Sequence, residues 1–327
     1  MREKFTEKPV GTGPYRFVER VINSRIVLES FDKYWGVKPK NKRIIFRPLP
    51  ENATRVAALE SGELQLINNL PTDVIDRISR NQNLQVLKAS TTRVMFVGLT
   101  ADRPPFNDVR VRQAMSFAID RRSLADDLLR GYAELAGGPM HPLISGFNNE
   151  LKPYVYDPER ARKLLAEAGY PNGLKIKFGY PNGRYLMDKQ VSEAIIGQLA
   201  KSGITSEPEM PEWATFYTRR REGKYDAWFY GMGANTMEPD YALQWFGALH
   251  FSKYNNATVD KLLADASATT DESEATRYYK EAQRVIWEEV PWVFLYFQPD
   301  LYGASRSLDG FVPRTDEYFL LSSAEVK

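Results

Sequence analysis

Apolar and polar residues alternate in three early segments of the chain, at 14–19, 25–31 and 43–48. This period of two is typical of strands that bury one face. The first two segments are expected to form a β-hairpin through residues 21–24, and the third to add another strand.

Apolar positions recur at helical spacing further along the chain. After Asn107 and Asp108, which are acceptable N-caps, the pattern predicts one long helix that ends at Gly131. A second helix is predicted over 157–168, with Asp157 as its N-cap and a proline at its first position.

The remaining pattern alternates short strands with helices, which indicates an α/β architecture with mixed sheets. The expected helices lie at 52–61, after Pro71, and at 187–202, 258–268 and 272–289; the expected strands lie at 64–67, 84–89, 93–99, 174–180 and 292–297, with a strand–helix–strand passage over 204–231. Linkers are expected at 135–153 and at the polar 298–310.

An apolar run ends in the sequence GMG at 231–233, which is close to a dinucleotide-binding fingerprint. Thr236 stands where the third glycine would allow close helix packing, and Pro239 disfavours a helical Glu238. No helix N-terminus can therefore face a pyrophosphate here. The glycines are instead expected to let the backbone approach a neighbour or a ligand closely.

Composition narrows the function classes. The chain has 327 residues, 43% hydrophobic and 26% charged, which suggests about two globular domains. The net charge is +2 and no long basic run occurs, so no nucleic-acid partner is expected, and the arginine triplet 219–221 is interpreted as a solvated helix face. No apolar stretch approaches the ~20 residues that span a bilayer.

Candidate catalytic chemistry is sparse. The absence of cysteine excludes disulfides, thiolate metal sites and cysteine nucleophiles. The two histidines, His141 and His250, have no partner at ligand spacing, so neither a metal site nor a Ser-His-Asp triad is expected. The sequence offers no general acid–base dyad, catalytic residue or cofactor site, and no enzyme activity is predicted.

Five stretches, in this order, resemble the solute-binding proteins of ABC importers of the peptide/nickel class, family 5. They are VGTGPYRFVERVINSRIVLESFDKYWG (10–36), RPPFNDVRVRQAMSFAIDRRSL (103–124), YDPERARKLLAEAGYPNG (156–173), EWATFYTRRREGKYDAWFYGMGAN (212–235) and YNNATVDKLLADASATTD (254–271). The resemblance covers essentially the whole chain.

The resemblance implies a periplasmic binding protein-like fold of type II, with two α/β lobes that enclose a solute. Residues 1–92 with 298–327 would form the first lobe, and residues 93–297 the second. The chain matches only the C-terminal two-thirds of a usual member, so it is expected to be N-terminally shortened, with an incomplete first lobe. Unpaired sheet edges and exposed apolar surface would then favour self-association.

The implied function is the substrate-binding component of an ABC-type uptake system. Its partners would be a small-molecule or short-peptide solute and the permease subunits, with the membrane reached only through the permease. The full-length protein would be periplasmic or extracytoplasmic, although this chain carries no export signal. Two alternatives stay open. One is a ligand-sensing module of a signalling or regulatory protein, and the other is a hydrolase or other enzyme, which would need a catalytic constellation.

The resemblance also implies ligand-binding residues. The position of Asn235 is an aspartate in oligopeptide binders, where it pairs with the peptide's amino terminus. The neutral Asn235 favours a neutral or anionic solute, such as a saccharide, an opine-like conjugate or a modified peptide. Asp240 would supply a nearby carboxylate, although its interpretation as the cap of a short helix over 241–246 is favoured.

The resemblance implies further candidate ligand-binding residues. Trp213 is either a stacking wall of the pocket or a core residue, and Arg220 either an anion-binding fork or, the favoured alternative, a surface charge. Met232 replaces a common tryptophan of the family. Tyr296 and Gln298 fall where hinge-side residues touch ligand; Tyr296 is equally compatible with the core, and Gln298 with solvent exposure.

Overall fold

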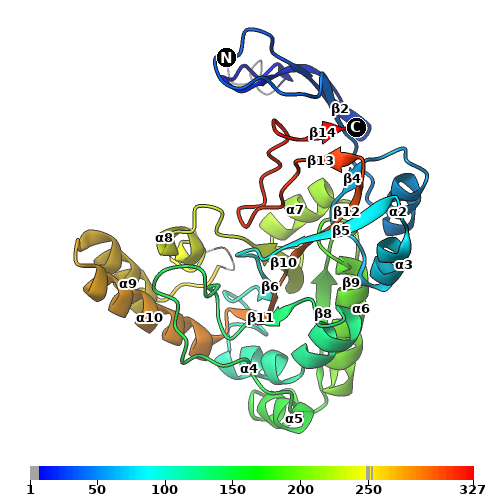
Figure 1. The fold of residues 1–327 in the computed structure, drawn as a ribbon. Coiled ribbons are helices and arrows are strands. Elements are labelled where there is room, and N and C mark those ends of the chain that lie inside the picture. The colour runs from blue at the N-terminus through cyan, green and yellow to red at the C-terminus, as the bar shows by residue number, and fades with distance from the viewer. Residues whose placement is uncertain (1–6, 248–250, 252) are drawn as a thin grey trace. The chain divides into compact units, whose positions relative to one another are not determined.

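The computed structural model describes residues 7–247, 251 and 253–327, and the chain divides into two compact units (Figure 1). Unit 1 comprises Met1–Ala89 and Leu301–Lys327, and unit 2 comprises Ser90–Asp300. The assignment of these units to the two lobes of a binding protein stays a prediction.

Unit 1 contains the predicted hairpin. The strands β1 (Tyr15–Val21), β2 (Arg25–Ser30) and β3 (Arg43–Phe46) form an antiparallel sheet in the order β1-β2-β3. A second sheet has the order β4 (Leu66–Ile67), β12 (Asp300–Ser305) and β5 (Leu84–Ala89), and β13 (Leu308–Asp309) pairs with β14 (Glu325–Val326). The helices of the unit are α2 (Asn52–Glu60), the 3-10 turn η1 (Thr72–Val74) and α3 (Ile75–Arg80).

The prediction of a polar linker over 298–310 is wrong, because β12 occupies the centre of this second sheet. Its residues Leu301, Tyr302 and Ala304 are buried on both faces, so the strand lacks the alternation that marks a half-exposed one. Gly303 has no side chain because a Cβ there would lie 2.6 Å from Leu59 Cδ2.

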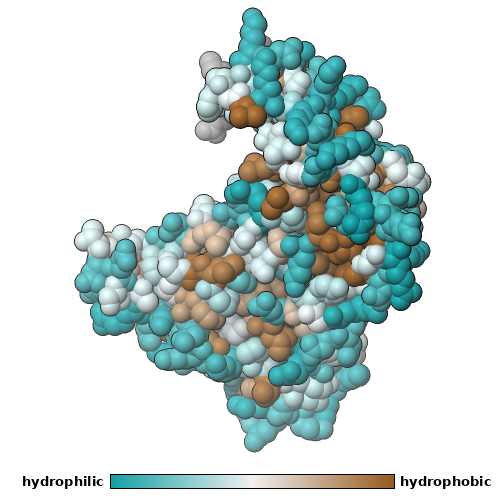
Figure 2. Space-filling view, in the orientation of Figure 1, coloured by the Kyte–Doolittle hydropathy of each residue, from teal (hydrophilic) through white to brown (hydrophobic). Residues whose placement is uncertain are grey.

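Apolar side chains remain exposed on unit 1. Ile26 on β2 and both Ile45 and Phe46 on the edge strand β3 are examples, and Figure 2 shows hydrophobic surface on this part of the chain. A cavity of about 620 Å³ in unit 1 is lined by β2, β3, β4 and the segment before the C-terminus. Self-association through this surface stays a prediction.

Unit 2 is built on a six-stranded sheet. Its order is β7 (Glu134–Leu135), β11 (Trp292–Phe297), β6 (Val94–Leu99), β10 (Ala227–Met232), β8 (Leu174–Gly179) and β9 (Ile204–Glu209). The strand β10 runs parallel to β8 and antiparallel to β6, so the predicted mixed sheet is confirmed. The rings of Phe96 and Trp292 stack at 3.7 Å between adjacent strands in the core.

Helices accompany this sheet, and apart from the break after α4 they lie at or near the expected positions. They are α4 (Val109–Phe117), the π-helical segment η2 (Ser123–Leu128), α5 (Pro158–Glu167), α6 (Asp188–Lys201), α7 (Trp213–Arg221), α8 (Pro239–Leu243), α9 (Ala257–Ala268) and α10 (Glu272–Glu289). Asp157 caps α5 as predicted, since its side chain accepts a hydrogen bond from the Arg160 amide at 2.9 Å.

The prediction of one helix from 108 to 131 is wrong, because α4 ends at Phe117. The buried guanidinium of Arg121 donates to the carbonyl oxygens of Ser116 and Ile119, at 2.8 and 3.1 Å. It thereby satisfies acceptors that a continuous helix would have bonded internally. The Asp120 carboxylate then accepts from the amides of Arg122 and Ser123 and starts the next helical segment.

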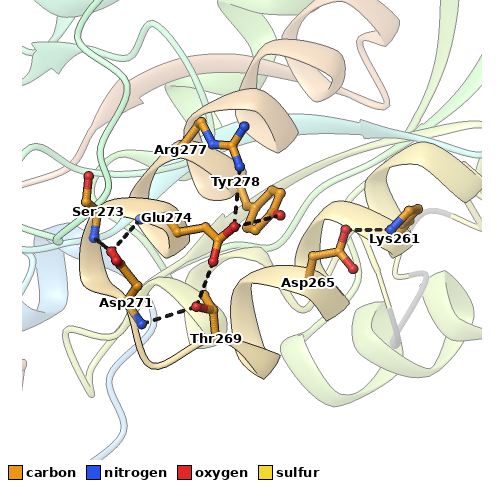
Figure 3. Close-up of polar contacts among 8 residues, drawn as sticks. All are labelled: Lys261, Asp265, Thr269, Asp271, Ser273, Glu274, Arg277 and Tyr278. Atoms are coloured by element: carbon orange, nitrogen blue, oxygen red, sulfur yellow. Dashed lines mark hydrogen bonds and ion pairs between the residues drawn. The ribbon is translucent and has the colours of Figure 1, made fainter.

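The hairpin between α9 and α10 is fixed by short polar side chains (Figure 3). Asp271 caps α10 by accepting from the amides of Ser273 and Glu274, at 2.9 and 3.0 Å. Glu274 in turn accepts from the hydroxyls of Thr269 and Tyr278, at 2.9 and 3.2 Å. These contacts satisfy the free amides of the first turn and set where the chain reverses.

Candidate functional site

The segment between β8 and α6 folds around the carboxylate of Asp188. This buried group accepts hydrogen bonds of 2.8–3.0 Å from four backbone amides, those of Gly183, Arg184, Tyr185 and Lys189. Burial raises the pKa of Asp188 above its ordinary value, and the four amide hydrogen bonds oppose that shift. The loop 183–187, which ends with a left-handed Met187, therefore has a defined course at the carboxyl end of β8.

Aromatic rings gather beside this loop. The Tyr230 ring on β10 lies 6.0 Å from that of Tyr185 and 5.7 Å from that of Trp213, at the start of α7. Phe216 packs 6.3 Å from Tyr230, and Phe251 lies 5.4 Å from it. We call these five rings the aromatic cluster. Trp213 remains partly exposed, so it can present a stacking face to a solute.

The interpretation of Arg220 as a surface charge is wrong. Its side chain is 93% buried (7% exposed), and its guanidinium carbon lies 3.8 Å from the Phe251 centroid and 5.4 Å from that of Tyr230. Among the described residues its Nε has no hydrogen-bond partner. Burial lowers the pKa of Arg220. The triplet 219–221 is thus not a uniformly solvated face, because the helical rotation turns its middle member into the cluster.

A second arginine, in the loop 183–187, lies beside the aromatic cluster. Arg184 is exposed, and its guanidinium carbon lies 5.1 Å from the ring centroids of both Tyr185 and Trp213. Burial raises the pKa of the Tyr230 hydroxyl, and the positive charges of Arg220 and Arg184 both lower it. Two guanidinium groups therefore act electrostatically on one hydroxyl of the aromatic cluster.

The turn after β10 is held by its neighbours. The Gly231 carbonyl accepts from the Tyr185 hydroxyl at 3.2 Å, and a Cβ at this glycine would lie 2.5 Å from Met95 Sδ. The expectation that a glycine here allows close approach is confirmed for Gly231. The Ala234 amide donates to Thr92 Oγ1 at 2.9 Å, which places the partly buried Asn235 directly after an anchored position.

Asp240 does not cap α8, and its carboxylate is hydrogen-bonded by two hydroxyl groups. The N-cap of α8 is Glu238, whose side chain makes no capping bond, and Asp240 is already inside the helix. Its carboxylate accepts from the hydroxyls of Tyr279 on α10 and Ser267 on α9, at 2.7 and 3.0 Å. The capping interpretation is therefore wrong, and Asp240 connects three helices.

Tyr296 and Gln298 are both buried, and Gln298 contacts the loop 183–187. Tyr296 is fully buried, and burial raises the pKa of its hydroxyl, with a smaller contribution from the nearby charge of Asp188. Gln298 is 1% exposed, and its Oε1 accepts from the Leu186 amide at 3.0 Å. The expected solvent exposure of Gln298 is thus wrong, because its side chain is buried and bonded to the loop.

The structure brings some of the predicted residues together and separates others. Trp213 and Arg220 share contacts with the Tyr230 ring, and Met232 is the last residue of the same strand. Asp240 is instead engaged with α9 and α10. Sequence reasoning missed Arg184, Tyr185 and Asp188, although a loop with Asn-Gly, Arg and Tyr after a parallel strand was a usable signal.

Within the described ranges, no group of three or more His, Cys, Asp or Glu side chains is placed to hold a metal ion. In the same part of the chain, no helix combines the length and apolar character that crossing a bilayer requires.

Comparison with known sequences decides the family. The profile described as "Bacterial extracellular solute-binding proteins, family 5 Middle" matches residues 2–252. The chain belongs to this family. The family consists of binding proteins and not of enzymes, so the interpretation of the sequence as non-enzymatic is confirmed.

Two characterised relatives illustrate the range of the family. Heme-binding protein A of Haemophilus influenzae is 30% identical over 324 residues, which cover 95% of this chain and 58% of that protein. The glutathione-binding protein GsiB of Escherichia coli is 31% identical over 334 residues, which cover 98% of this chain and 65% of the relative. The chain thus spans less than two-thirds of either relative.

Solved structures show the same architecture. DppA of Helicobacter pylori, in complex with the peptide STSA, superposes with a TM-score of 0.91 at 27% identity, covering 98% of this chain and 64% of that one. NikA of Staphylococcus aureus, in complex with Ni(L-His)2, gives 0.91 at 26% identity, covering 98% and 70%. The predicted periplasmic binding protein-like fold is confirmed.

Proposed function

We propose that this chain is the substrate-binding component of an ABC-type uptake system. The observation that supports this function best is the aromatic cluster of unit 2, at the carboxyl ends of β8 and β10, in a member of a solute-binding family. Open α/β sheets bind their ligands at this edge. The cluster offers stacking area from the partly exposed Trp213.

Binding would use closure of two lobes around one solute. In this proposal unit 1 is the first lobe and unit 2 the second. The permease subunits of the importer would recognise the closed form, and the protein would act outside the cytoplasm, as the description of its family indicates. The membrane would be reached only through the permease.

The solute would be peptide-like, opine-like or a saccharide. The peptide-like class is supported by a relative named for glutathione and a solved structure that holds a peptide, while another relative is named for heme. Asn235 argues against recognition of an amino terminus by charge, because an amide cannot neutralise an ammonium group.

Native mass spectrometry of the protein purified from cells tests this function. We expect a discrete extra mass on the monomer that is lost on denaturation. The identity of this bound solute then decides which purified compound is used to measure affinity by calorimetry. Trp213→Ala should weaken binding by about tenfold, since an aromatic contact contributes about 1 kcal/mol or more. Trp287→Ala, which removes a partly buried tryptophan outside the cluster, should leave affinity unchanged. A bare protein that binds neither glutathione nor short peptides would contradict the proposal.

A further inference from the structure

We propose that Thr92 and Gln298 are positioning residues for solute binding, which tie both segments of the candidate site to the places where the chain passes between its two units. Both side chains are buried, so they act through other residues and not on the solute itself. The inference rests on the proposed solute-binding function and adds the residues through which the site and the connection of the units depend on each other.

The chain crosses between the units twice. It enters unit 2 between residues 89 and 90 and leaves it between residues 300 and 301. The stretches of unit 2 next to these crossings are 90–93 and 298–300, and we call them the junction segments. A change in the arrangement of the units has to alter the backbone at or near these segments, because both covalent connections run through them.

The two junction segments are bonded to each other. The Thr91 hydroxyl donates to the Gln298 carbonyl at 2.7 Å, and the Gln298 amide donates to the Arg93 carbonyl at 2.9 Å. Thr91 Oγ1 also accepts from the Arg93 amide at 3.1 Å. The segments therefore form one hydrogen-bonded pair, and displacement of one displaces the other.

Thr92 connects the first junction segment to the turn after β10. Its Oγ1 accepts from the Ala234 amide at 2.9 Å, directly before Asn235. Thr92 and Ala234 are each 3% exposed, so water cannot replace this acceptor when it is removed. The course of the turn therefore depends on the position of the Thr92 side chain.

Gln298 connects the second junction segment to the loop 183–187. Its Oε1 accepts from the Leu186 amide at 3.0 Å, and both residues are 1% exposed. Leu186 directly follows Tyr185, whose ring belongs to the aromatic cluster and whose hydroxyl donates to the Gly231 carbonyl at 3.2 Å. The loop and the turn are thus bonded to each other, and each is bonded to a different junction segment.

These contacts make the site and the junction segments interdependent. A solute that contacts Tyr185 or Asn235 favours one course of the loop and turn, and through Gln298 and Thr92 it favours one course of the junction segments. The dependence is reciprocal, since a coupling free energy acts equally in both directions. Loss of either side-chain acceptor should therefore weaken solute binding and widen the range of distances between the units.

Calorimetry on the full chain with glutathione and Ala-Ala-Ala as probes measures the effect on affinity. Thr92→Val and Gln298→Met keep similar side-chain volumes and remove one acceptor each, so each should weaken binding about fivefold, which corresponds to one neutral hydrogen bond. Thr92→Ser retains the hydroxyl and should bind as the wild type does. The Thr92 variants decide the question if Gln298→Met does not fold.

Thr100→Val is the matched control. Thr100 lies just beyond the opposite end of β6 from Thr92, is likewise 3% exposed, and donates one hydrogen bond of 2.9 Å from its hydroxyl to the Tyr225 carbonyl. The control therefore loses a buried hydrogen bond of the same length at a place away from the junction segments. It should leave the affinity for both probes unchanged.

The distance between the units is a second readout, which loss of a purely structural contact would leave unchanged. The chain has no cysteine, so Gln82→Cys in unit 1 and Lys201→Cys in unit 2, both exposed positions, can carry spin labels. Pulsed electron spin resonance on the protein as purified should give a broader distance distribution for Thr92→Val than for Thr100→Val. This measurement needs no added probe.

The other outcomes contradict separate claims. If the wild type binds a probe and Thr92→Val binds it as tightly as Thr100→Val does, the inference is wrong and the proposed function stands. Equal distance distributions in these two variants would also overturn the inference. If the wild type binds neither probe and carries no solute as purified, both the proposed function and the inference are wrong.

Discussion

The carboxylate of Asp240 accepts a hydrogen bond of 2.7 Å from the hydroxyl of Tyr279, and this contact connects α8 with α10. The same carboxylate oxygen accepts from Ser267 on α9. Since α8 follows the turn that carries Asn235, this contact ties the segment after the turn to a different helix.

Tyr279→Phe should therefore lower the free energy of unfolding of the chain by about 1 kcal/mol, the typical contribution of one hydrogen bond. The ring and its packing against Gly146 are retained, so the loss reports the hydroxyl alone. Urea denaturation followed by tryptophan fluorescence would measure it. Tyr278→Phe removes a hydroxyl from the neighbouring position, bonded at 3.2 Å to Glu274, and should cost less. An unchanged midpoint in Tyr279→Phe would show that this contact is absent in solution.

Arg121→Leu should destabilise unit 2 by about 3 kcal/mol or more, because several buried acceptors would lose their donor at once. The guanidinium donates to the Ser116 carbonyl and hydroxyl, and to the Phe294 carbonyl on β11, at 2.8, 2.7 and 2.6 Å. Burial lowers the pKa of Arg121 to about 10, so the group stays charged near neutral pH.

Arg122→Leu is the matched control for this change, since Arg122 is exposed and adjacent. It should alter the unfolding free energy by less than about 0.5 kcal/mol. Thermal and urea unfolding of both variants would separate the two. Similar stabilities of Arg121→Leu and the wild type would contradict the described role of Arg121 in ending α4.

The free energy of unfolding should depend on pH through His141. Burial lowers the pKa of this imidazole, with a smaller opposing effect from the Glu134 charge, and its Nδ1 accepts from the Leu143 amide at 3.1 Å. The unfolded chain therefore binds a proton more readily than the folded chain. Stability contributed by neutral His141 is present above the ordinary histidine pKa of about 6.5 and is lost as the pH falls below it.

His141→Asn keeps an acceptor for the amide two residues on but cannot titrate in this range. The difference in unfolding free energy between wild type and this variant should shrink as the pH is lowered from about 7 to 5. Urea denaturation across this range would measure it. A difference that is constant with pH would mean that protonation of His141 is not coupled to folding.

Asn235→Asp should raise affinity for solutes that carry an amine, by about tenfold if the new carboxylate reaches the ammonium group. Calorimetry with Ala-Ala-Ala and its N-acetyl derivative would show whether the gain requires the free amine. Thr236→Asp adds the same charge at the exposed neighbouring position and should give a smaller effect. No gain for any amine would exclude Asn235 from the solute contacts.

Gly98→Ala and Gly197→Ala should change stability in opposite directions. A Cβ at Gly98 on β6 would lie 2.5 Å from Cε2 of the Trp228 indole, so the substitution should cost about 2 kcal/mol. At Gly197 on the exposed side of α6 nothing lies within 4 Å, and alanine should add about 0.5–1 kcal/mol. Thermal unfolding of both variants gives the comparison; a stable Gly98→Ala protein would show that the indole can shift.

Elements with one buried face were predictable from the sequence. The hairpin of β1 and β2 and the helix α5 follow from alternation, helical spacing and the cap at Asp157. The strand β12 was not, because Asp300, Gly303 and Ser305 interrupt its apolar residues, so the segment shows neither alternation nor a continuous apolar run. The break after α4 depends on a buried arginine that binds carbonyls from β11, a contact that is not visible in local sequence.

The candidate site shows the same limit. Trp213 was identified from the family resemblance and Gly231 from the residues around it, yet the burial of Arg220 involves packing against Phe251, a residue in a different segment of the chain. Asp240 was assigned to the nearest helix start because local capping is the only partner that sequence reveals. Its hydroxyl partners, Ser267 and Tyr279, come close only once α9 and α10 have packed.

The loop 183–187 has a thermodynamic consequence for recognition. The Asp188 carboxylate accepts hydrogen bonds from the amides of Gly183, Arg184, Tyr185 and Lys189. Gln298 accepts one from the Leu186 amide. The conformational entropy of these residues is therefore lost when unit 2 folds and not when a solute arrives. A pre-organised loop of this kind spares association the cost of ordering about five residues, so weak polar contacts with a small solute can suffice for affinity.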